Sequence, residues 1–396
     1  MSTSNSSRVL IYVQHLLGVG HLRRAIHLST ALLQQGFRVD LVSGGMPGHF
    51  PAAQTLRVHQ LPPLYSPDGS FSRLLDANGN DIDDHWREQR KQQLLEIFEA
   101  CAPQVLITET FPFGRRMLQF ELLPLLRASR ESGDCKLVIA SIRDILQPKS
   151  KPERNQETCD LIDTWYDRVL VHGDEKIARL KDSFVLSDRF EDKVFYSGYI
   201  CAPEARSAPT GEPAGEGVDE VLVSAGGSAT GLQILQTALR AKSLSSLNHL
   251  HWRVLVSQAI PAADFNQLQA MAGDGVTVER NRPDFSELIK RAQLSISQAG
   301  YNTMTDLLNS DTAAVVIPYA EADEKEQSMR AHALQSCGRV IALDQSELAA
   351  ASLAEAINAA TKAALRQRPG LAVNLNGATN SATMITQWLQ DTEAMS

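Results

Sequence analysis

Cysteine is scarce in this sequence, and the few cysteines form no metal-binding or redox motif. Five cysteines are scattered over 396 residues, and no two of them make a C-x-x-C pair. An odd, scattered set disfavours a disulfide framework or a zinc site and fits a reducing compartment. We therefore expect a cytoplasmic protein.

Long apolar runs and an excess of basic residues are also missing. There is no run of about 18 apolar residues, and residues 1–7 are small and polar. The sequence thus predicts neither a membrane span nor a signal peptide, while peripheral contact with the inner face of a membrane stays open. The 46 acidic residues outnumber the 38 basic ones, and the net charge of −8 disfavours general nucleic-acid binding.

Strand-like and helix-like segments alternate through both halves of the chain. An apolar strand pattern opens the first half at residues 8–14, and another opens the second half at 220–224. Residues 202–217 are rich in Pro and Gly and are typical of a linker. We predict an α/β protein with two Rossmann-like, doubly wound parallel-sheet domains, residues 1–201 and 218–396, whose last helix can pack back on the first domain.

The most informative segment is SISQAGYNTMTDLL at residues 295–308. An apolar strand ends in a glycine turn at Gly300, and Asn302 and Thr303 follow as residues that favour a helix start. A helix N-terminus has free N–H groups and a positive dipole end, which predicts a phosphate site. Asp306 follows within the same helix, where its carboxylate can reach a ribose hydroxyl.

Other segments of the second half can complete this site. After a strand at 313–317, Glu326 and Gln327 can hydrogen-bond sugar hydroxyls. Small residues, which favour phosphate binding in a loop, follow the strand at 220–224. They are Ser224, Gly226, Gly227 and Ser228. Arg282 lies in a turn between a strand and a helix, where backbone groups can hold a base, although many such loops have this pattern. Together these segments indicate a nucleotide-sugar site.

Two glycines and a histidine follow the first strand. Gly18 and Gly20 allow a ligand to approach the backbone, and His21 at the helix start can take a proton as a neutral imidazole. The alternative is a tight turn with an exposed histidine cap. The third glycine of a dinucleotide fingerprint is missing, because Arg23 stands in its place.

Charged residues follow two more strands of the first half. Glu109 is a candidate base or hydroxyl acceptor, and Arg115 and Arg143 can meet an anionic acceptor molecule. The alternatives are a proline turn with solvated arginines after Glu109 and a simple ion pair between Arg143 and Asp144. The basic residues at 23–24 and 87–91 are interpreted as solvated helix faces. The segment His172-Gly-Asp174 is interpreted as a helix cap, with a position lining the cleft as the alternative.

The second half resembles the C-terminal domain of family 28 glycosyltransferases. This family includes the bacterial enzyme that adds N-acetylglucosamine to the lipid-linked peptidoglycan precursor. The similarity rests on 297–308, 315–319, Glu326-Gln327 and Arg330-Ala331. Four first-half segments resemble an uncharacterised predicted-glycosyltransferase branch of the family. They are GVGH at 18–21, ETFPFG at 109–114, SIRD at 141–144 and YSG at 196–198.

The resemblance implies a GT-B fold, in which two Rossmann-like domains face a cleft and the C-terminal one binds the donor. It implies that Asp306 holds the ribose, where the family usually has glutamate. The other implied contacts are Gly300 and Thr303 with the phosphates, Glu326 and Gln327 with the sugar, Ser224 and Gly227 with the diphosphate, and His21 in the N-terminal glycine loop. The family's peptidoglycan enzyme has Gln in place of Glu326.

The resulting hypothesis is a hexosyltransferase that uses a nucleotide-diphosphate sugar, in the first place a UDP-sugar, and needs no metal or other cofactor. Main-chain amides would stabilise the departing diphosphate, and His21 or Glu109 would take the acceptor proton. The acceptor would be a lipid-linked molecule or a small glycoside, with no nucleic acid as partner. The alternatives are a nucleotide-sugar 2-epimerase on the same fold and a non-catalytic donor-binding subunit.

Overall fold

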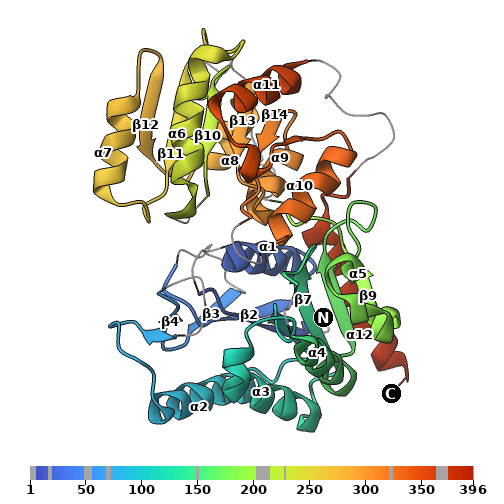
Figure 1. The fold of residues 1–396 in the computed structure, drawn as a ribbon. Helices are drawn as coiled ribbons and strands as arrows, with labels where there is room; N and C mark the ends of the chain where they lie inside the picture. The colour runs from blue at the N-terminus through green and yellow to red at the C-terminus, as the bar shows by residue number, and fades with distance from the viewer. Residues whose placement is uncertain are drawn as a thin grey trace. The chain divides into compact units, whose positions relative to one another are not determined.

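The computed structural model describes residues 6–16, 20–48, 56–67, 73–148, 151–201, 215–226, 229–320, 324–362 and 373–395 (Figure 1). The chain divides into two compact units. The first contains Met1–Glu175, Arg179–Ile200 and Asn376–Ser396, and the second contains Lys176–Ala178 and Cys201–Leu375. Residues 202–214 of the predicted linker lie outside the described residues.

The first unit is built on a seven-stranded parallel sheet in the order β3-β2-β1-β6-β7-β8-β9. Its strands are β1 (Arg8–Val13), β2 (Arg38–Ser43), β3 (Leu56–Gln60), β6 (Val105–Glu109), β7 (Leu137–Arg143), β8 (Arg168–His172) and β9 (Val194–Tyr196). The strand order reverses between β1 and β6. A short antiparallel pair, β4 (Leu64–Tyr65) and β5 (Leu75–Asp76), lies in the segment that follows β3.

Helices cover both faces of this sheet, which agrees with the burial of nearly every residue in its central strands β1, β6 and β7. The helical elements are α1 (Gly20–Gln34), α2 (Asp84–Cys101), η1 (Arg116–Leu118), α3 (Gln119–Glu131), α4 (Pro152–Trp165), α5 (Leu180–Ser183), η2 (Val185–Lys193) and α12 (Gly377–Met395). In Figure 1, α2, α3 and α4 lie together on the face opposite α1. Helix α12 packs beside α1, and its Ile385 and Trp388 share a core with Leu28.

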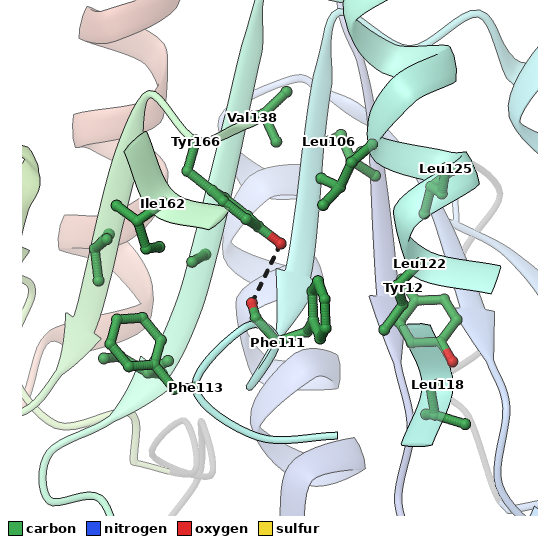
Figure 2. Close-up of a cluster of buried hydrophobic side chains, with 14 of the residues drawn as sticks. Tyr12, Leu106, Phe111, Phe113, Leu118, Leu122, Leu125, Val138, Ile162 and Tyr166 are labelled. Carbon is green, nitrogen blue, oxygen red and sulfur yellow. Dashed lines mark hydrogen bonds between the residues drawn. The ribbon is translucent and has the colours of Figure 1, made fainter. Parts of the chain in front are cut away.

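The core on the α2–α4 face anchors the loop after β6 (Figure 2). Phe111 and Phe113 are buried in it, and burial of a phenylalanine side chain contributes about 1.5–3 kcal/mol. The hydroxyl of Tyr166 donates to the carbonyl oxygen of Phe111 at 3.4 Å, and Thr108 Oγ1 donates to the same oxygen at 2.9 Å. These contacts fix Glu109 at the end of its strand.

The second unit has six parallel strands in the order β12-β11-β10-β13-β14-β15. They are β10 (Val221–Ser224), β11 (Trp252–Val256), β12 (Val276–Arg280), β13 (Leu294–Ser297), β14 (Ala313–Val316) and β15 (Ile341–Ala342). The helical elements are η3 (Ala229–Gly231), α6 (Leu232–Ala241), η4 (Lys242–Leu244), α7 (Ala262–Met271), α8 (Phe285–Arg291), α9 (Tyr301–Leu308), α10 (Glu326–Ser336), η5 (Gln345–Glu347) and α11 (Ala350–Thr361). This is the doubly wound strand order, with its reversal between β10 and β13.

The prediction of two doubly wound α/β sheets is confirmed. In the second unit, alternate strand residues such as Val223 and Ile296 share one core with Leu235 of α6 and Ile357 of α11. Within the described ranges, no helix combines the length and the apolar character needed to cross a lipid bilayer.

Candidate functional site

Predicted site residues lie at the point of strand reversal in each unit. In the first unit, His21 follows β1 and Glu109 ends β6, and these two strands are neighbours. In the second unit, Ser224 ends β10 and Gly300 follows the adjacent strand β13. Open α/β sheets bind ligands at this carboxyl edge, because the loops on either side diverge there. Each unit therefore presents a candidate site of its own.

His21 and Glu109 contact each other at the first of these points. Nδ1 of His21 lies 3.1 Å from Oε1 of Glu109, and the histidine side chain keeps 20% exposure while the glutamate is buried. The Nη2 atom of Arg24 donates to the same Oε1. The interpretation of Arg24 as a solvated charge is wrong, because its side chain is buried in an ion pair with this carboxylate.

The charges of this group follow from its surroundings. Burial raises the pKa of Glu109, but the charge of Arg24 and the hydrogen bond with His21 outweigh it and hold that pKa well below its usual range. Burial lowers the pKa of His21 to about 3, and the nearby arginines act in the same direction. The pair is thus a carboxylate and a neutral imidazole at neutral pH. A carboxylate beside Nδ1 favours a proton on that atom and leaves Nε2 as the basic atom.

A chain of buried hydrogen bonds continues from Glu109. Ser141 Oγ donates to Glu109 Oε2 at 2.7 Å and lies 2.8 Å from Nε2 of His172. Nδ1 of His172 lies 3.0 Å from Oγ of Ser197. Because the hydroxyl proton of Ser141 goes to the carboxylate, Nε2 of His172 donates to Ser141, and Nδ1 accepts from Ser197.

Sequence reasoning missed this chain. His172, interpreted as a helix cap, is fully buried, and that interpretation is wrong. A signal was available, because Ser141, His172 and Ser197 lie at the carboxyl ends of three neighbouring parallel strands, β7, β8 and β9. Polar residues at such ends meet at one edge of the sheet.

Two arginines add positive charge to this edge. Burial, together with the charge of Arg143, lowers the pKa of Arg115 to about 10, so Arg115 remains a cation at neutral pH. Its Nε atom donates to the carbonyl oxygen of Gln14 at 3.0 Å. The neighbouring Arg116 is 59% exposed and pairs with Glu157 instead. Of the two predicted glycines, Gly20 begins α1, and Gly18 lies outside the described residues.

In the second unit, Gly300 is the N-cap of α9, and Asn302 and Thr303 lie in the first turn. The φ of Gly300 is −65°, which any residue can adopt, and Gly300 itself offers no side chain to cap the helix. The first N–H groups of a helix have no acceptor within it. A Cβ atom at Gly300 would meet no heavy atom within 4 Å. Neither conformation nor packing therefore requires glycine here, whereas a phosphate that approaches the backbone does.

The loop after β10 lies beside this turn. Ser224 is buried at the end of the strand, and Gly226 has a φ of +73°, which favours glycine. A Cβ atom added at Gly226 would lie 3.4 Å from Oε1 of Gln298, so the loops after β10 and β13 are adjacent. Gly227 and Ser228 lie outside the described residues.

The acidic residues of the second unit have internal partners. Oδ1 of the buried Asp306 accepts from Ser286 Oγ at 2.7 Å. Oε1 of the buried Glu326 accepts from Arg330 Nη2 at 2.7 Å, and Nη1 of Arg330 donates at 2.9 Å to the carbonyl oxygen of Ala299, next to Gly300. The Glu326–Arg330 pair thus supports the turn before α9. Contact of Glu326 with a sugar stays a prediction.

Gln327 and Arg282 also have protein partners. Oε1 of Gln327 accepts from the main-chain N–H of Tyr319 at 3.1 Å, which links α10 to the loop after β14. Arg282 pairs with Glu216 at 2.6 Å and with Asp284 at 2.8 Å. Any role of these two side chains in donor binding stays a prediction.

One group of possible metal ligands occurs among the described residues: Asp40, His59 and Cys101. His59 Nε2 lies 2.8 Å from Asp40 Oδ1, whereas two such ligands on one zinc ion would stand roughly 3.3 Å apart. Burial and the neighbouring Asp40 raise the pKa of the Cys101 thiol to about 12, so it stays protonated. We assign this trio to structural hydrogen bonding.

Residues 221–383 match the family model of the glycosyltransferase family 28 C-terminal domain. This part of the chain belongs to that domain family. The family 28 domain contains both strands of the second reversal point and the α9 turn, and its match extends into α12. The resemblance inferred from residues 297–308 is thereby confirmed.

Curated relatives share parts of the sequence. Two of them are UDP-N-acetylglucosamine–N-acetylmuramyl-(pentapeptide) pyrophosphoryl-undecaprenol N-acetylglucosamine transferases. The one from Paramagnetospirillum magneticum is 30% identical over 142 residues, which is 35% of this chain and 38% of the relative. The one from Nitrosomonas europaea is 26% identical over 220 residues, 50% of this chain and 60% of the relative. The chain thus matches less than two thirds of either relative's length.

Solved structures match nearly the whole chain. The calicheamicin glycosyltransferase CalG4 has a TM-score of 0.60 at 12% identity, with 97% of this chain and 98% of that chain covered. Acinetobacter baumannii MurG has a TM-score of 0.57 at 13% identity, with 96% and 99% covered. These similarities show that the fold is GT-B, as predicted.

Proposed function

We propose that the protein is a glycosyltransferase that moves a hexosyl group from a nucleotide-diphosphate sugar, in the first place a UDP-sugar, to an acceptor hydroxyl without a metal. The observation that carries the proposal is the start of α9. A glycine that neither backbone nor packing requires lies there at the strand reversal of the family 28 domain. The donor's diphosphate is the ligand that suits this position.

On the donor side, the bond between the anomeric carbon and the diphosphate breaks, and negative charge develops on the leaving phosphate. Main-chain N–H groups at the start of α9 and in the loop after Ser224 stabilise that charge. Preorganised donors of this kind can contribute about 3 kcal/mol each. Asp306, held by Ser286, would accept from a ribose hydroxyl.

On the acceptor side, the hydroxyl oxygen attacks the anomeric carbon while its proton passes to Nε2 of His21. The ionised Glu109 holds Nδ1 and stabilises the imidazolium that forms. General-base catalysis of this kind typically contributes about 100-fold or more. Arg115 and Arg143 favour an acceptor with an anionic group, such as the lipid-linked pyrophosphate named for the curated relatives. Such an acceptor would bring the enzyme to a membrane surface.

The test begins with a panel of nucleotide sugars and the purified full chain. A ligand present at about 100 times its dissociation constant adds about 2.7 kcal/mol to the unfolding free energy, which raises the thermal midpoint. The stabilising donor is then incubated with lipid-linked and small glycoside acceptors, and products are identified by mass spectrometry. Incubation of UDP-N-acetylglucosamine alone distinguishes a 2-epimerase. A panel in which no nucleotide sugar raises the midpoint would refute the proposal.

A further inference from the structure

The tautomer of His21 depends on where the carboxylate of Glu109 stands. Nδ1 of His21 lies 3.1 Å from Oε1 of Glu109, which is an acceptor. It also lies 3.1 Å from Nη2 of Arg24, which can only donate, and 3.1 Å from Oγ1 of Thr110, which can do either. Nε2 is left as the basic atom only when Nδ1 donates to the carboxylate. The groups that hold Glu109 in place therefore help to select the basic nitrogen.

One of these groups is Ser141, whose hydroxyl has a single proton to give. That proton goes to Oε2 of Glu109 only if Nε2 of His172 donates to Ser141, which leaves Nδ1 of His172 as an acceptor. The Oγ atom of Ser197, 3.0 Å from this Nδ1, is the donor. The same Oγ lies 3.1 Å from the carbonyl oxygen of Gly198. If the hydroxyl turned there, Nδ1 could carry the proton of His172, and Nε2 would draw the proton of Ser141 away from Glu109.

Helix α12 fixes the place of Ser197, in the turn at 197–199. Nδ2 of Asn380, the fourth residue of the helix, donates to the carbonyl oxygen of Ser197 at 2.8 Å. The main-chain N–H of Gly377 donates to the carbonyl oxygen of Tyr199 at 3.0 Å. A Cβ atom added at Gly377 would lie 2.3 Å from the carbonyl oxygen of Gly198, so the helix and the turn approach as closely as only glycine allows. The position of the Ser197 hydroxyl thus follows from the packing of α12.

We propose that Ser197 and Asn380 are positioning residues for the catalytic base. The inference rests on the proposed function, in which His21 takes the proton of the acceptor. Neither residue touches the reacting atoms. Both act along the buried hydrogen-bond chain, which orients Glu109 and thereby keeps the proton of the neutral imidazole on Nδ1. The last helix of the protein then contributes to the catalytic centre of the first unit.

The tautomer of His21 can be measured by NMR correlation of ring protons with ring nitrogens in the full chain with isotope-labelled histidine. The variant His21→Gln assigns the signals. At neutral pH, the unliganded wild type should show the Nδ1–H form. Ser197→Ala and Asn380→Leu should each lower the ratio of the Nδ1–H to the Nε2–H form about threefold or more, the scale of one neutral hydrogen bond. The Kd for UDP, measured by calorimetry, should not change, because the proposed donor site belongs to the second unit.

Thr386→Val is the matched control. Thr386 is likewise a half-buried polar residue of α12, but its Oγ1 atom donates at 2.9 Å to the carbonyl oxygen of Ala382 within the same helix. This variant should keep the wild-type ratio of tautomers. Thermal unfolding shows which variants fold, and if Asn380→Leu does not, Ser197→Ala decides the question, because it removes only one oxygen atom.

The outcomes separate the inference from the function beneath it. A wild-type protein that binds none of UDP, thymidine diphosphate and GDP refutes the proposed function and with it the catalytic role. A wild type that binds UDP, with the same ratio of tautomers in Ser197→Ala and Asn380→Leu, refutes only the positioning. A wild type whose His21 carries its proton on Nε2 also overturns the positioning.

Discussion

Ser141 lies between Glu109 and His172, with its Oγ atom 2.7 Å from the carboxylate and 2.8 Å from the imidazole. Removing this hydroxyl leaves the carboxylate with one donor fewer and deprives Nε2 of His172 of this acceptor. We expect Ser141→Ala to lower kcat about tenfold with little change in the donor KM, because one hydrogen bond to a charged group is worth about 1.5–3 kcal/mol. Steady-state kinetics measures both constants.

Rescue separates positioning of Glu109 from simple loss of stability. Ser141→Thr restores the hydroxyl in a residue that strands accept readily, and it should recover most of kcat. A kcat that Ser141→Ala leaves at the wild-type value would show that the hydrogen bond has no part in catalysis.

The pH dependence of catalysis follows from the low pKa of His21. A base with a pKa of about 3 stays unprotonated as the pH falls from 8 to 5. We therefore expect kcat/KM to show no acid limb near 6.5, the ordinary histidine value. The pH–rate profile tests this, and a limb at 6.5 would mean that His21 is not the base in the environment described here.

The pH dependence of stability follows from His172. Its pKa is lowered by burial to about 3 in the folded protein, whereas the unfolded chain binds the proton near 6.5. Between these values the unfolded state holds more protons, so stability falls as the pH drops, by up to about 1.4 kcal/mol per pH unit for one group. Urea titrations at pH 7 and 5 should show a smaller loss for His172→Gln than for the wild type. Equal losses would contradict the prediction.

Gly300 and Gly231 should respond differently to alanine. At Gly300 a methyl group has space, so Gly300→Ala should change the unfolding free energy by less than about 1 kcal/mol while it obstructs the diphosphate and weakens UDP binding. At Gly231 the added Cβ would collide with Cβ of Ala225, so Gly231→Ala should destabilise the unliganded protein. Calorimetry and thermal unfolding check both variants. Unchanged UDP affinity in Gly300→Ala would remove the α9 turn from the site.

Arg115 and Arg116 form a matched pair of adjacent cations. Only Arg115 lies at the carboxyl edge with Glu109 and Arg143, whereas Arg116 pairs with Glu157. Arg115→Gln should therefore raise the acceptor KM about tenfold, as loss of a charged hydrogen bond predicts, and Arg116→Gln should leave it unchanged. Acceptor titrations at saturating donor measure the difference. Equal effects in both variants would mean that Arg115 does not contact the acceptor.

The sequence predicts the strand ends well and the side-chain partners poorly. Alternation of apolar strands and helices is a local pattern, so it places His21, Glu109 and Gly300 at the carboxyl edges without any knowledge of tertiary structure. Partners depend on contacts between distant segments. Arg90 is interpreted from the sequence as part of a solvated helix face, but its side chain is fully buried. There its Nε atom donates to Oε2 of Glu121 in α3 at 2.7 Å. No periodicity within α2 contains that information.

The same reasoning applies to Gln298. Its place between a strand and a glycine turn is visible in the sequence, but the sequence does not show that, within the described part of the chain, its Nε2 atom has no hydrogen-bond partner. That property depends on every acceptor that folding brings near it, or fails to bring.

Helix α12 has a consequence for biosynthesis. It comes from the end of the chain, yet its Ile385 and Trp388 complete a core whose strands are made first. The first unit therefore cannot complete this core until the second unit has been synthesised. Until then, one apolar face of its sheet stays partly uncovered. A chaperone that shields this face during translation would be expected to raise the yield of folded protein.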